Sequence, residues 1–283
     1  MNLLSITLLA FYAAATTFAQ SASWKKVFVP GEELKYSVSW RFVRLGTIIV
    51  QADNDNSSPN PASVKITMRV ESNPALSFVW IREQNISWID PERLISLRFR
   101  AVQRNDDDVY RLSYDYDTTL KKAECIQTDA NTGERMIFRT FQNVGPYVEG
   151  PSLVFFTRCR AQSVGLYTVP TLVNGEIRST ELDFRGEEEE IEVAGSDYPV
   201  RSRVYHGMAN WDNGGSAGLS GQFRGWTSDD DASVILRAEM KVILGSISME
   251  LEEWHRPGWI PPTGSSSTVN DGAANLANKP VTR

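Results

Sequence analysis

The stretch 225-GWTSDDDASVILRAEMKVILGSISMEL-251 decides the fold class. From Val234 to Val242 apolar residues alternate with charged ones, and after Gly245-Ser246 the alternation resumes from Ile247 to Leu251. A period of two is typical of a strand with one buried face. Short Ser and Asp side chains bond to nearby backbone and favour turns. The stretch therefore predicts a tight turn at 228–231 followed by two antiparallel strands.

The same alternation recurs through most of the chain. In 33–40, Leu34, Tyr36, Val38 and Trp40 alternate with polar residues. Further strand-like runs lie at 47–52, 63–72, 84–89, 94–103, 109–117, 121–128, 166–173, 177–184, 190–195 and 200–207. The pattern predicts a mainly β fold, a strongly curved antiparallel sheet or an open barrel or sandwich. A division into two lobes stays open.

Two short helices and one hairpin tip interrupt the strand pattern. Asn73-Pro74 and Gly150-Pro151 place a cap or a proline where helices begin, which predicts short helices over 73–81 and 150–162. The acidic run 187–190 follows Gly186, and we expect it at a solvated hairpin tip.

The two ends of the chain differ in composition from the middle. An apolar run from Leu3 to Ala15 is followed by Thr17 and Ala19, which fit a signal-peptidase site. This run is shorter than the ~18 residues that span a bilayer. We expect a cleaved signal peptide at 1–19, a β-rich exported domain at 20–256 without a transmembrane segment, and a disordered tail at 257–283. The predicted location is periplasmic or extracellular.

Charge and cysteine content limit the classes of function. The 283 residues carry a formal net charge of -6, which gives nucleic acid no electrostatic attraction and excludes it as an expected partner. Cys125 and Cys159 are the only cysteines. In an oxidising compartment they could form a disulfide, and the alternative is two buried thiols.

The acidic triplet Asp229–Asp231 is the first candidate for chemistry. A metal-dependent hydrolase could use it with Arg158 or His206 nearby. However, neither histidine lies beside a nucleophile elbow, and the chain has neither a Walker loop nor a paired-histidine metal helix. We therefore favour the turn interpretation, and we predict no metal and no cofactor.

Three motifs resemble an exported bacterial family, domain of unknown function 3108. They are Pro30-Gly31-Glu32 before the first long strand, 150-GPSLVFFTRCR-160, and the Trp-Thr-Ser-Asp-Asp turn at 226–230. The second motif is similar to the family's central helix, whose arginine corresponds to Arg158. The chain departs from the family in having Gly150 where an aspartate is common. The resemblance implies an exported, β-rich, single-domain protein and carries over no activity.

A non-enzymatic binding or envelope-assembly protein is the favoured function. Its curved sheet would present an apolar concavity, built from segments 34–40, 64–70 and 76–81, to a lipid, a glycan or an envelope protein. The alternatives are that the aromatic residues are simply core, and that the hydrolase at Asp229–Asp231 exists. The oligomeric state stays open. The candidate ligand-binding residues are Tyr36, Trp40, Trp80, Arg158, Trp226, Asp229 and Asp230.

Overall fold

The structure is a computed structural model that describes residues 24–54, 62–76, 80–105, 107–211, 220–242 and 245–264. The predicted signal peptide at 1–19 and positions 265–283 of the predicted tail lie outside the described residues. The strands are β1 (Glu32–Trp40), β2 (Val43–Asp53), β3 (Val64–Ser72), β4 (Arg82–Asp90), β5 (Ile95–Asn105), β6 (Asp108–Asp117), β7 (Lys122–Asp129), β8 (Arg135–Phe141), β9 (Gly165–Val173), β10 (Glu176–Ile191), β11 (Val200–Asn210), β12 (Gly221–Ser228), β13 (Ile235–Val242) and β14 (Gly245–His255). The helices are α1 (Trp24–Val27) and α2 (Gly150–Arg160). The mainly β prediction is confirmed.

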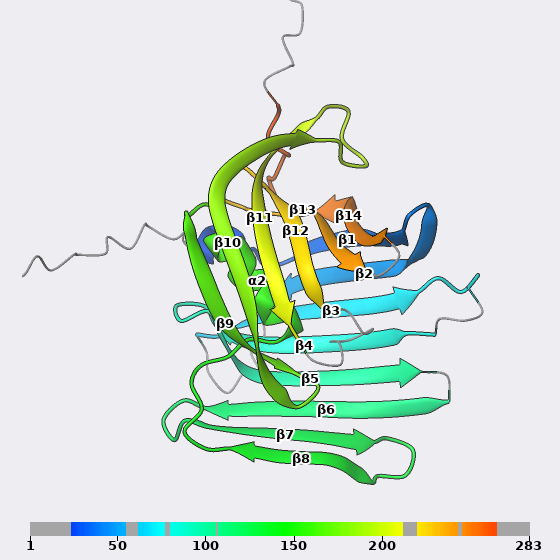
Figure 1. Cartoon of the computed structure of the whole chain (residues 1–283), viewed down its shortest axis with the longest axis vertical. Coiled ribbons are helices and arrows are strands. Elements are labelled where there is room, and N and C mark those ends of the chain that lie inside the picture. The colour runs from blue at the N-terminus through cyan, green and yellow to red at the C-terminus, as the bar shows by residue number, and fades with distance from the viewer. Residues whose placement is uncertain are drawn as a thin grey trace, which may run out of the picture.

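All these strands form one antiparallel sheet, and β1, the first strand of the chain, lies in the middle of it. The order is β8-β7-β6-β5-β4-β3-β2-β1-β14-β13-β12-β11-β10-β9. The chain winds outward from β1 to the edge strand β8, crosses to the other edge through α2, and winds back from β9 to β14 beside β1. In Figure 1, β9–β12 run steeply while β3–β8 run nearly level, so the sheet turns strongly. α2 packs against β3, β4 and β5.

The two edges of the sheet approach each other without pairing into a closed barrel. The guanidinium of Arg139 on β8 donates to the Gly175 carbonyl at 3.1 Å and to Glu176 at 2.9 Å, in the turn between β9 and β10. Val148, just before α2, makes a parallel bridge to Thr171 on β9. The result is a strongly curved, open sheet, as the sequence predicts.

The second predicted helix is α2, whereas the described part of the first, residues 73–76, is not helical. The side chain of Asn73 accepts a 3.0 Å hydrogen bond from the Ala75 backbone, which makes a turn of 73–76 instead of a helix start. Residues 77–79 lie outside the described residues, and α1 at Trp24–Val27 is a short helix that the sequence pattern did not predict.

The hairpin tip expected at 187–190 is wrong. β10 runs through these glutamates to Ile191, with a register shift between Phe184 and Glu188. Gly186 has a φ of 75°, which favours glycine and lets the strand bend there. Figure 1 shows β10 bending over the top of the molecule. The acidic run therefore belongs to a bent strand.

The predicted boundary at 256 cuts through contacts of the domain. Thr263 makes an antiparallel bridge to Val200 at the start of β11. The ring of Trp259 lies 5.7 Å from that of Trp254, and its indole nitrogen donates to Asp230 at 2.7 Å. In the structure, residues 257–264 are part of the domain.

The two cysteines are free, so the possible disulfide is not formed. Cys159 on α2 packs in the apolar cluster with Leu34, and Cys125 on β7 packs in a separate cluster with Phe99. Burial raises the pKa of each thiol to about 12. Both thiols are neutral, buried core groups.

Candidate functional site: an apolar cavity beside α2

Two of the three motifs that carry the family resemblance contribute to one buried polar cluster, which we call the Glu32 cluster: Glu32, Arg158 and Arg256. Arg158 donates to the Glu32 carboxylate at 2.5 and 3.1 Å, and Arg256 donates to the same carboxylate. Arg158 also donates to the carbonyls of Ala232 at 3.0 Å and Ser233 at 3.2 Å. The cluster thus ties β1, α2, the turn before β13 and the segment after β14 together.

The Glu32 cluster is a buried ion network of one carboxylate and two guanidiniums. Glu32 is 2% exposed and Arg158 is 3% exposed. Burial alone would raise the pKa of Glu32, but the charges and hydrogen bonds of Arg158 and Arg256 outweigh it and lower the pKa. A buried charge that is fully paired in this way holds elements together. The predicted role of Arg158 in ligand binding is not supported by its contacts.

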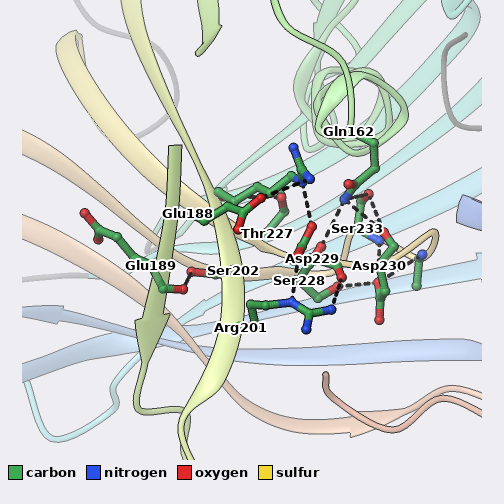
Figure 2. A network of polar contacts seen from close by, with 12 residues as sticks. Gln162, Glu188, Glu189, Arg201, Ser202, Thr227, Ser228, Asp229, Asp230 and Ser233 are labelled. Carbon is green, nitrogen blue, oxygen red and sulfur yellow. Dashed lines mark hydrogen bonds and ion pairs between the residues drawn. The ribbon is translucent and has the colours of Figure 1, made fainter. Parts of the chain in front are cut away.

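The acidic triplet forms the turn between β12 and β13, as the turn interpretation predicts. One oxygen of Asp230 accepts hydrogen bonds from the Ser228 hydroxyl at 2.8 Å and from the backbone of Ala232 and Ser233 at 3.0 and 3.1 Å. Asp229 binds Arg201 at 2.7 Å and Arg203 at 2.6 Å. Figure 2 shows the turn, with Gln162 reaching into it from beyond α2.

The residues that a hydrolase would need do not converge. His206 lies on β11 with its Nε2 3.2 Å from Glu187 on β10, while Asp229 is held by two arginines and Asp231 is exposed. In the part of the chain that the structure describes, no group of three or more His, Cys, Asp or Glu side chains is arranged to hold a metal ion.

The predicted tyrosine and tryptophans are dispersed over the fold. Tyr36 is buried in the core at 1% exposure, and burial raises its pKa. Trp226 is buried and donates to Glu189 at 2.7 Å. Trp40 lies at the end of β1 beside Arg41, and Trp80 is 48% exposed before β4. None of the seven predicted residues is among the described residues that line the cavity below.

The cavity lies between α2 and the inner face of the curved sheet and has a volume of about 370 Å³. Gly150, Leu153, Val154 and Thr157 form one wall, because this spacing places them on one side of α2. The remaining wall is mostly apolar side chains from both halves of the sheet, including Val38, Met68, Leu112, Leu182, Met240 and Met249. Its size falls in the range of small-molecule sites.

Two glycines shape the sheet wall of the cavity. Tyr205 on β11 is paired with Gly225 on β12, and Gly207 with Phe223. A Cβ on Gly225 would lie 2.2 Å from the Tyr205 ring, and one on Gly207 would lie 2.1 Å from the Phe223 ring. The absence of these side chains lets both rings lie against the sheet. Tyr205 and Phe223 both line the cavity, so the glycines create space inside it.

Glu149 is the acidic group in the cavity wall that is itself buried, at 1% exposure. It is the N-cap of α2 and forms a capping box with Ser152. Its carboxylate accepts from the Ser87 hydroxyl at 2.7 and 2.8 Å and from the Ser152 hydroxyl at 3.0 Å. These hydrogen bonds lower the pKa of Glu149, but burial outweighs them and raises it to about 7. It is therefore close to half-protonated near neutral pH.

Sequence reasoning missed Glu149 and the cavity. The available signal was Glu149-Gly150-Pro151-Ser152, an acid three residues before a serine at a predicted helix start. Such spacing indicates a capping box. It does not reveal that β4 would bury the carboxylate against Ser87, because that contact joins residues 62 positions apart.

A second, larger hollow of about 660 Å³ lies over β9–β14 and is lined largely by charged and polar residues. Several of these charges are already paired: Asp183 with Arg185, His206 with Glu187, and Arg224 with Glu189. The apolar cavity beside α2 is therefore the stronger candidate site.

The fold and the cavity define an open, strongly curved β protein with an apolar interior. The chain belongs to the family described as "Protein of unknown function (DUF3108)", whose model matches residues 35–252. No curated protein matches the chain. Neither described helix has the length and apolar run required to cross a membrane.

Two solved structures are similar to this chain. One is a "beta-barrel-like protein of domain of unknown function DUF1849" from Brucella abortus, with a TM-score of 0.52, 9% identity, and coverage of 81% of this chain and 98% of that one. The other is a "putative exported protein with YmcC-like fold" from Bacteroides fragilis, with a TM-score of 0.29, 9% identity, and coverage of 81% and 97%. The first supports the fold alone, and the second is too distant to carry an argument.

Proposed function

We propose that this protein is an exported, non-enzymatic binding protein that holds an apolar molecule in the cavity between α2 and the sheet. The observation that carries the proposal is the cavity itself, about 370 Å³ with mostly apolar walls. Water in such a space lacks polar partners, so an apolar ligand that displaces it gains the hydrophobic free energy of burial. A lipid, or the apolar part of one, fits this chemistry better than a glycan.

Two further features support this proposal. The apolar run at residues 3–15 with small residues at 17 and 19 is the pattern of an export signal. The carboxylates proposed for a hydrolase are engaged otherwise, since Asp229 binds two arginines and Asp230 accepts from the Trp259 indole and its own turn. These contacts favour a structural role for the triplet over a catalytic one.

The test is binding of a neutral apolar dye, N-phenyl-1-naphthylamine, followed by its fluorescence. Ala238 on β13 lines the cavity, so Ala238→Phe places a ring in the space that the ligand needs. Ala194→Phe is the matched control, because it adds the same ring at an exposed position outside the cavity. We expect saturable dye binding to the unmodified chain and to A194F, and strongly reduced binding to A238F. Equal binding by all three chains, or no binding at all, contradicts the proposal.

A further inference from the structure

The interior contains two buried acids with opposite environments. Glu32 at 2% exposure is paired with two arginines. Among the described residues, the partners of Glu149, which is 1% exposed, are neutral: the hydroxyls of Ser87, Ser96 and Ser152 and the Ser152 amide. Buried charges in proteins are normally paired, because desolvation of a lone charge is expensive. Glu149 therefore lacks the cation that its buried carboxylate would require.

The position of Glu149 indicates where such a cation could come from. Glu149 forms part of the cavity wall, next to Gly150 and one helical turn from Leu153. The donors around the carboxylate are the hydroxyls of Ser87, Ser96 and Ser152 and the Ser152 amide, all of them neutral. A serine hydroxyl can rotate to another acceptor, so an ammonium inside the cavity can take its place at the carboxylate while an apolar chain fills the space along α2.

We propose that Glu149 is the ligand anchor of the cavity and that the ligand is an amphiphile with a cationic amino group on an apolar chain. This rests on the proposed function and names its ligand class. The ammonium would supply the charge that Arg158 and Arg256 supply to Glu32. The remainder of the chain would contact the apolar wall, where Val154, Met68 and Met249 lie.

The groups around Glu149 give this binding a pH dependence. Those that face it are the phenols of Tyr114 on β6 and Tyr147 before α2, and the hydroxyls of Ser87 on β4, Ser96 on β5 and Ser152 on α2. Burial raises the pKa of both phenols, so they stay neutral near pH 7. Protonation of Glu149 therefore removes the anchoring charge. Amine affinity should fall about tenfold per pH unit below the pKa of Glu149.

The experiment compares dodecylamine, dodecanol and dodecanoate as competitors of N-phenyl-1-naphthylamine at pH 8. We expect dodecylamine to compete best. Glu149→Gln keeps the shape and removes the charge, and it should weaken dodecylamine roughly tenfold to a hundredfold while leaving dodecanol unchanged. Glu253→Gln is the control, since Glu253 lies outside the cavity wall and its side chain is 66% exposed. It should leave the preference for the amine intact.

The pH profile of the unmodified chain is an independent readout that needs no variant. Between pH 8 and pH 5 the competition by dodecylamine should weaken, whereas that by dodecanol should not. Equal competition by amine and alcohol at pH 8, or an amine preference that E149Q retains as fully as E253Q, overturns the anchor and leaves the proposed function standing. Failure of the dye itself to bind overturns both.

Discussion

Replacing Glu32 by glutamine is expected to destabilise the fold far more than replacing another ion-paired glutamate. Glu32 accepts from Arg158 at 2.5 and 3.1 Å and from Arg256, and all three side chains are at most 5% exposed. The substitution leaves two buried guanidiniums without a counter-charge. Breaking a buried pair from one side typically costs about 3 to 5 kcal/mol. We expect the free energy of unfolding of E32Q to fall by that amount.

Glu253→Gln is the matched control. Glu253 binds Lys35 at 2.5 Å, the same distance as in the buried pair, but its side chain is 66% exposed. Solvent screens this pair, so its loss should change stability little. In urea unfolding with typical slopes of about 2 to 3 kcal/mol per M, E32Q should lower the midpoint by about 1 to 2 M. Equal midpoints for E32Q and E253Q would refute the view that the Glu32 cluster holds the elements together.

Three further predictions follow from single groups. Because the pKa of Glu149 is raised from 4.5 to about 7, its contribution to stability is complete below pH 4.5 and is lost as pH rises through about 7. Between pH 4.5 and pH 8 the free energy of unfolding of the unmodified chain should fall by on the order of 3 kcal/mol more than that of E149Q, measured by chemical unfolding. Identical pH profiles for the two chains would contradict this. Gly225→Ala should destabilise the fold by about 1 to 3 kcal/mol in thermal or urea unfolding, since its Cβ would lie 2.2 Å from the Tyr205 ring. Gly145→Ala, with nothing within 4 Å, should be tolerated, and equal effects of the two would argue against the close packing of Tyr205. Thiol titration should find both cysteines only after denaturation, and fewer than two per chain would indicate the disulfide that the structure lacks.

Local patterns in the sequence predict most of the strands. The alternation in 234–242 and 247–251 corresponds to β13 and β14, and Asp230 caps its turn as short polar residues commonly do. The proline-marked helix start at 150 also forms. These features depend on neighbouring residues, so period and turn chemistry are sufficient to find them.

What the sequence does not reveal depends on contacts between distant residues. β8 escapes the alternation pattern because both Met136 and Arg135 are exposed at a sheet edge. β10 passes through the glutamates at 187–190, where Glu188 pairs with Arg203 on β11 and Glu189 with Arg224 on β12.

The candidate site shows the same limit. The sequence suggests Arg158 as a ligand contact, whereas in the structure it pairs with Glu32, 126 residues away, inside the core. Glu149 was not proposed, although it lines the cavity. Which distant strand packs against a charged residue decides whether that residue is paired with an opposite charge. The periodicity of the sequence contains no information on such distant contacts.

The most direct test of the central claim is native mass spectrometry of the protein released intact from the envelope of its own cells. The account predicts that the folded chain carries extra mass, that organic solvent releases this mass as an apolar compound, and that A238F prepared in the same way carries none. Bare mass for both the unmodified chain and A238F, or equal extra mass on both, would contradict binding in the cavity beside α2.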